Sequence, residues 1–138
     1  MKEQTPLAHT IALISNLMGQ LEAEAFEQEG FSELSLRQVL YLETIAKMEA
    51  PTFSELADKL GVTKPSVTAL VHKLIRMGYV QKTQSTEDRR VYHIVLAPKG
   101  EQFTEMHDNI HQLLAARLAE NLDQAEVQQL NTILQKVT

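Results

Sequence analysis

The chain has 138 residues, of which 43% are hydrophobic and 22% charged, and it contains no cysteine. This composition is typical of one soluble domain, and the lack of cysteine excludes disulfides, thiolate metal sites and thiol nucleophiles or redox sensors. No apolar run approaches the roughly 18 residues of a membrane-spanning helix, so we expect no membrane partner. The lack of cysteine fits a reducing compartment, so we expect a cytoplasmic location.

The net charge of −5 is distributed unevenly. Residues 54–100 carry eight Lys or Arg against four acidic residues, a net charge of +4, whereas residues 1–53 carry −5 and residues 101–138 carry −4. Local charge decides which surface meets phosphate. The basic middle of the chain is therefore the segment in which nucleic-acid binding is expected.

The first half of the chain is predicted to be helical. Apolar residues at alternating spacings of three and four predict an amphipathic helix over 7–29, which Gly30 ends. Capping patterns predict three further helices, which begin at Ser35, Thr52 and Thr63 and end near Met48, Gly61 and Gly78.

A β-hairpin is predicted next. Residues 80–83 and 91–96 favour strands around the polar tip 85–90, and Pro98 and Gly100 are expected to end the hairpin. After Gly100 the helical period returns for one long helix, and Asp123 with Glu126 caps a last one. The expected fold class is mainly α with a small β-hairpin (α+β).

Residues 53–70 form a candidate helix-turn-helix. Ala57 is small where the second helix is expected to cross, and Gly61 occupies the turn, where we expect a positive φ. The residues predicted to fill the wedge between the helices are Leu56, Leu60, Val62, Val67 and Leu70. An ordinary helical hairpin needs the same apolar residues, but the basic hairpin that follows favours a winged helix-turn-helix.

The outward face of the second of these helices offers hydroxyls and cations but no carboxylate. Such a helix can enter a major groove, although a solvated cationic face has a similar composition. The residues expected to contact DNA are Lys64, Pro65, Ser66, Thr68, Ala69, His72, Lys73 and Arg76 on the helix, and Asp88, Arg89 and Arg90 at the hairpin tip. At the hairpin tip, guanidinium groups could reach a minor groove if Asp88 orients one of them. The alternative is a solubilising turn that prevents the edge of the hairpin from pairing with another strand.

Together these stretches resemble the MarR family of winged helix-turn-helix transcriptional regulators over nearly the whole chain. The resemblance is carried by residues 53–80 and by Asp88-Arg89-Arg90 followed by residues 96–100, in which Ala97 stands where the family usually has threonine. It implies a single domain over residues 1–138, with dimerisation helices at 7–29 and 101–138 and a winged-helix lobe at 35–100.

The resemblance also implies a homodimer that binds a pseudo-palindromic operator in double-stranded DNA, usually as a repressor. Release by a small-molecule effector, a metal or an oxidant is implied as well, and the missing thiol excludes the oxidant. In the family's pattern Arg90 would be the wing arginine nearest the minor groove, with Asp88 beside it.

Two other classes of function are alternatives to DNA binding. An enzyme is not expected, because no nucleophile elbow, phosphate-binding glycine loop or recognisable catalytic set is present, and no cofactor is expected. A winged helix that only contacts proteins is the second alternative, and the carboxylate-free helix face argues against it. Salt-dependent DNA binding would separate the two.

Zinc sensing is a more specific alternative. His107 and His111 are four residues apart on one predicted helix, the spacing that lets two imidazoles share a metal ion. Glu24 or Glu22 could supply a carboxylate, but no further histidine or cysteine ligand is evident. Two histidines at helical spacing are usually polar-face residues, so no metal site is predicted.

Overall fold

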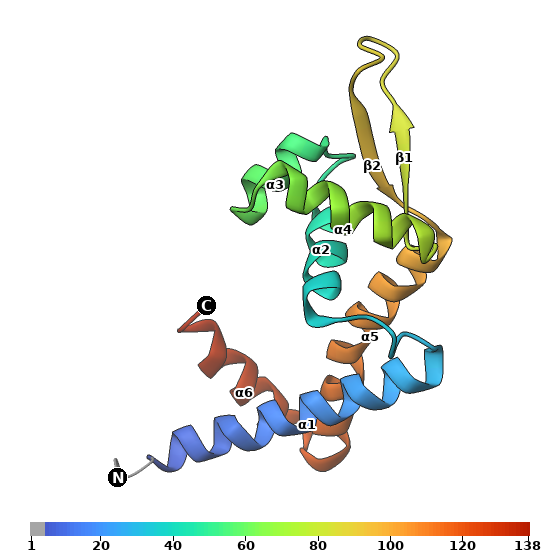
Figure 1. Ribbon diagram of the computed structural model, residues 1–138. Coiled ribbons are helices and arrows are strands. Elements are labelled where there is room, and N and C mark those ends of the chain that lie inside the picture. The colour runs from blue at the N-terminus through green and yellow to red at the C-terminus, as the bar shows by residue number, and fades with distance from the viewer. Residues whose placement is uncertain (1–4) are drawn as a thin grey trace. The chain divides into compact units, whose positions relative to one another are not determined.

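The computed structural model describes residues 5–138, and within them six helices and two strands follow one another (Figure 1). They are α1 (Pro6–Glu29), α2 (Leu36–Lys47), α3 (Phe53–Leu60), α4 (Lys64–Arg76), β1 (Val80–Gln84), β2 (Tyr92–Leu96), α5 (Pro98–Asn121) and α6 (Gln124–Gln135). This confirms the mainly helical fold class. None of the helices described is both long and apolar enough to cross a membrane.

The chain divides into two compact units. We call Gly30–Met106 the central unit, and residues 5–29 together with His107–Thr138 the terminal unit. The central unit contains α2, α3, α4, the hairpin and the first turns of α5. It therefore holds all the residues predicted to contact DNA.

The predicted helix starts are confirmed by the caps. Ser35 and Gln38 form a full capping box at α2, and Asp123 and Glu126 form another at α6. Thr63 caps α4 by accepting the Ser66 backbone N–H, with a proline in the first turn as predicted. These side chains satisfy backbone donors that a helix start leaves without partners.

The turn between α3 and α4 follows the prediction at Gly61, which has a φ of 65° and ends α3 in the left-handed conformation. Leu56 and Val67 are fully buried between the two helices, while Leu60 and Leu70 are half-buried. The prediction that Val62 fills the wedge was wrong, because its side chain is 42% exposed. Val62 follows the left-handed residue, and the reversal of the chain there turns it outward.

The hairpin pairs β1 with β2 in antiparallel register, with Val80 opposite Leu96 and Gln84 opposite Tyr92. The strands run one residue further at Gln84 and start one residue later at Tyr92 than predicted. An isolated bridge joins Thr52 to His93, and the Ile94 N–H donates to the Pro51 carbonyl at 2.8 Å. The segment before α3 is thereby fixed to β2 of the wing.

The start of α5 corrects the sequence prediction. Helix α5 begins at Pro98 and not after Gly100, because proline is favoured in the first turn of a helix, where its missing N–H is not needed. Gly100 does not end the hairpin. It lies in the first turn of α5, where an added Cβ would come within 2.2 Å of the Tyr79 carbonyl oxygen.

A polar cluster fixes the loop before α2. One carboxylate oxygen of Glu33 accepts hydrogen bonds from the Tyr79 hydroxyl and the Lys99 ammonium, both at 2.8 Å. These bonds, that of Lys99 first, lower the pKa of Glu33. Burial, together with the bond to Glu33, raises the pKa of Tyr79 well above its usual range. The loop is thus tied to the base of the wing and to α5.

The terminal unit leaves apolar side chains in solvent. Neither α1 nor α6 contains a buried residue among those described. The side chains of Leu7, Ile11, Ile133 and Val137 are between 58% and 81% exposed. Since apolar area in water is unfavourable, these helices present surface that is suited to burial against a partner.

Candidate nucleic-acid interface

A cleft of about 320 Å³ separates α4 from the wing in the central unit. Among the described residues that line it, Lys64, Lys82 and Arg90 are cations, and none is a carboxylate. Hydroxyl groups and rings complete the lining, which comprises Thr52, Phe53, Ser54, Thr68, His72, Val91 and Tyr92. A concave surface of this composition favours an anionic group with several oxygen acceptors.

Helix periodicity explains which residues of α4 face the cleft. Lys64, Thr68 and His72 are spaced by four and therefore lie on one stripe of the helix. The ring of His72 also packs edge-on against Phe53, with the two centroids 6.1 Å apart. The remaining predicted helix residues do not line the cleft but are exposed elsewhere on α4, namely Pro65, Ser66, Ala69, Lys73 and Arg76.

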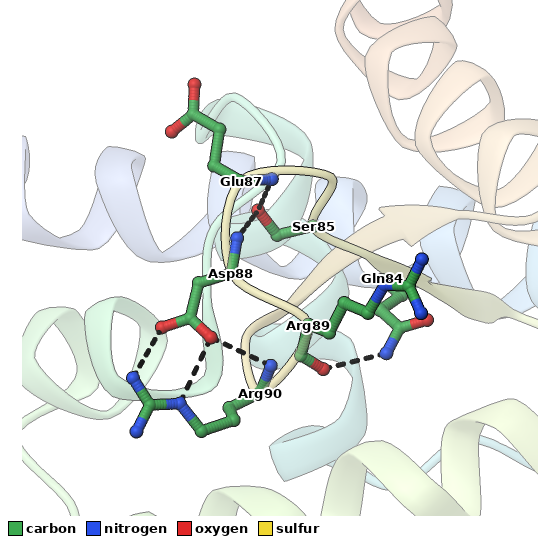
Figure 2. A network of polar contacts seen from close by, with 6 residues as sticks. All are labelled: Gln84, Ser85, Glu87, Asp88, Arg89 and Arg90. Atoms are coloured by element: carbon green, nitrogen blue, oxygen red, sulfur yellow. Dashed lines mark hydrogen bonds and ion pairs between the residues drawn. The ribbon is translucent and has the colours of Figure 1, made fainter.

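The wing tip is organised by Asp88, as Figure 2 shows. Its carboxylate accepts from the Arg90 guanidinium through Nε and Nη2, both at 3.1 Å, and from the Arg90 backbone N–H at 3.0 Å. The guanidinium bonds, and then the backbone bond, lower the pKa of Asp88. The two-point contact fixes both the position and the plane of the Arg90 guanidinium.

Two further side chains shape the turn at the tip. The Ser85 hydroxyl accepts from the backbone N–H groups of Glu87 and Asp88, and the Gln84 amide donates to the Arg89 carbonyl at 2.7 Å (Figure 2). The side chains of Arg89 and Arg90 leave the turn in different directions (Figure 2). Arg90 lines the cleft and Arg89 does not.

Several cleft residues have no signal in the sequence pattern. Thr52 and Ser54 lie at the start of α3, and Lys82 and Tyr92 come from the paired strands. The Lys82 ammonium lies 4.9 Å from the centre of the Tyr92 ring, a cation–π distance. The charge count of residues 54–100 includes Lys82, but only the strand pairing places it beside α4.

The histidine pair considered for zinc lies in the terminal unit. The rings of His107 and His111 are 6.1 Å apart at their centroids. Within residues 5–138, no group of three or more His, Cys, Asp or Glu side chains is arranged to hold a metal ion, so Glu24 and Glu22 do not complete a set with them.

Comparison with known proteins decides the family. Residues 34–92 match the family model described as the MarR family. The chain belongs to the MarR family. Members of this family regulate transcription and do not form an enzyme class.

Two curated relatives illustrate the match. The HTH-type transcriptional repressor YetL of Bacillus subtilis is 35% identical over 98 residues, which are 68% of this chain and 58% of YetL. The transcriptional repressor MprA of Escherichia coli is 32% identical over 78 residues, which are 53% of this chain and 44% of MprA. The chain thus spans about half the length of these MarR-family relatives.

Solved structures share the whole fold. Wild-type MarR of E. coli in its apo form has a TM-score of 0.58 and 25% identity, with 98% of each chain covered. A mutant MepR of S. aureus bound to an oligodeoxyribonucleotide has a TM-score of 0.74 and 22% identity, with 97% of this chain and 96% of MepR covered. These matches confirm the predicted winged helix-turn-helix fold of the MarR family.

Proposed function

We propose that the protein is a sequence-specific transcriptional repressor. It binds a pseudo-palindromic operator in double-stranded DNA as a homodimer, and a small-molecule effector releases it. The observation that carries the proposal is the cleft between α4 and the wing, whose described lining includes three cations and no carboxylate. In this role the protein acts in the cytoplasm, where it meets its operator.

Each part of the interface has a distinct role in this proposal. The exposed face of α4 enters the major groove, where side chains reach base edges. The cleft receives the backbone phosphates beside that groove, held by Lys64 and Lys82. Arg90, aimed by Asp88, reaches the adjacent minor groove. The MepR mutant that shares this fold is bound to an oligodeoxyribonucleotide, which supports DNA binding by the fold.

The exposed apolar surface of the terminal unit supports the homodimer. Leu7, Ile11 and Ile14 lie on one stripe of α1, and Ile133, Leu134 and Val137 gather at the end of α6. Pairing of identical surfaces around a twofold axis is the commonest way to bury such area. A dimer would place two copies of α4 about one DNA turn apart, roughly 34 Å, and would select inverted repeats.

Selection of bound genomic fragments tests the function directly. We expect an enriched motif with inverted symmetry, and an affinity that falls linearly with the logarithm of salt concentration. Sedimentation at micromolar concentration should give a dimer. A monomer, or a preference for a single asymmetric half-site, would contradict the proposal, and weak binding without sequence preference would favour a protein-contact module. Repeating the selection with candidate ligands would identify the effector.

A further inference from the structure

Ser66 and Thr68, both near the start of α4, have hydroxyl groups in opposite hydrogen-bonding states. The Thr63 hydroxyl donates to the Ser66 hydroxyl oxygen at 2.8 Å, while the Thr63 oxygen accepts the Ser66 backbone N–H at 3.3 Å. A hydroxyl has a single proton and two acceptor lone pairs. With one lone pair of Ser66 occupied by Thr63, its own proton is available, and the residue is exposed on the outer face of α4.

Thr68, one half-turn further along α4, has the reverse polarity. Its hydroxyl donates to the Lys64 carbonyl at 2.9 Å, the usual back-bond of a threonine inside a helix. That bond uses the only proton of the side chain. Thr68 therefore presents its methyl group and acceptor lone pairs to a ligand, but no donor.

The major groove distinguishes bases by the same properties. Purines present N7 as an acceptor, guanine adds O6, thymine presents O4 and a methyl group, and cytosine presents an amino donor. We infer that Ser66 reads a purine N7 as a hydrogen-bond donor, that Thr68 contacts a thymine methyl group, and that Thr63 is the positioning residue that sets the direction of the Ser66 proton. This inference rests on the proposed DNA binding and names the base edges that the interface selects.

Base analogues test the inference one atom at a time. The operator obtained by selection is remade with 7-deazaguanine or 7-deazaadenine at each purine of both half-sites, which removes N7 alone. A second series replaces each thymine by uracil, which removes the methyl group alone. Affinity for unsubstituted operator, measured over several salt concentrations, reports separately whether DNA binding itself occurs.

We expect one purine position in each half-site at which a single 7-deaza base weakens binding about three- to tenfold, the size of one hydrogen bond. In Ser66→Ala the same replacement should have no effect, because the donor is gone. One thymine position should likewise be sensitive to uracil in the parent but less so in Thr68→Ser, which keeps the hydroxyl and loses the methyl group. Both comparisons are ratios within one variant, so a general change of affinity cancels.

Two substitutions at Thr63 test its positioning role. Thr63→Asp keeps an acceptor for the helix cap but has no proton to give, so the Ser66 hydroxyl should turn inward and the 7-deaza effect should disappear. Thr63→Ser keeps both functions and should retain the effect. Melting temperatures of both variants show whether α4 stays folded. A 7-deaza effect that persists in Ser66→Ala or Thr63→Asp would overturn the inference, even though DNA binding stands. Salt-independent or absent binding by the parent protein would instead overturn the proposed function.

Discussion

Replacing Arg90 by alanine should weaken operator binding mostly at low salt. The Arg90 side chain is 90% exposed, and its one ion pair within the described chain is the contact to Asp88 at 3.1 Å. Its loss should therefore leave the melting temperature unchanged. What changes is the charge that the wing brings to DNA.

The magnitude follows from counterion release. Each neutralised phosphate contributes about −0.9 to the slope of log affinity against log salt, and a dimer carries two wings, so the slope should become shallower by about 1.8. Between about 50 and about 200 mM salt, this slope change makes the loss of affinity about tenfold larger at the lower concentration. Titrations of labelled operator by fluorescence anisotropy at several salt concentrations measure it.

Asp88 allows the charge of Arg90 to be separated from its direction. Asp88→Asn keeps the Arg90 cation but removes the group that orients it, so the slope should stay near that of the parent, while binding to unrelated DNA should strengthen relative to binding to the operator. The double variant with Arg90→Ala restores the parent's net charge. Because no cation remains at this position, its slope should still be shallower than that of the parent by about 1.8, and its preference for the operator should stay low.

Arg117→Ala is the matched control, since it removes the same charge from an exposed position on α5 in the terminal unit. Its slope should equal that of the parent. If Arg90→Ala also binds like the parent at every salt concentration, Arg90 does not face DNA and the role given to the wing is wrong. If it melts much lower, Arg90 supports the fold instead.

Three further predictions concern stability. Gly100→Ala should cost about 1–3 kcal/mol, because its Cβ would collide with a backbone carbonyl, whereas Gly19→Ala, in an open part of α1, should be neutral or stabilising in thermal melts. Glu33→Gln should lower the melting temperature near neutral pH. The lowered pKa of Glu33 gives stability above its ordinary value of 4.5 that is lost as pH falls through the folded pKa, so the gap to the parent should close in acid. Val62→Thr should change the free energy of unfolding by less than about 0.5 kcal/mol, while Val67→Thr, which buries a hydroxyl, should cost about 1–3 kcal/mol in denaturant titrations.

The sequence was sufficient where structure depends on neighbours in the chain. The caps at Ser35 and Thr63 and the left-handed Gly61 follow from hydrogen bonds and sterics within four residues, and the structure confirms them. The helical stripe of α4 is local in the same way. The fold class and the basic face of α4 could therefore be predicted from spacing alone.

The parts that were missed depend on contacts between distant segments. Ala50 has a φ of 40°, an uncommon conformation for a residue with a Cβ, and its carbonyl lies 2.7 Å from Nδ1 of His93 on β2. Nothing near Ala50 in the sequence indicates that partner. The close approach of Gly100 to Tyr79, twenty-one positions earlier, leaves no local pattern, so the sequence near Gly100 predicts only a turn.

The polar groups of the interface fall into two kinds, and the difference bears on how it selects DNA. Arg90 is held by Asp88, and Ser66 by Thr63, so their orientations are set before DNA arrives. Ordering a free side chain on binding costs about 0.5–1.5 kcal/mol, and an oriented group avoids part of that cost. Such a group is also restricted to ligands whose atoms lie where it already points. Within residues 5–138, no ion pair holds Lys73 or Arg76 on α4. Exposed cations that no ion pair orients can follow phosphates on any sequence, so these two should supply affinity. The oriented groups should supply the preference for particular bases and for a narrow minor groove.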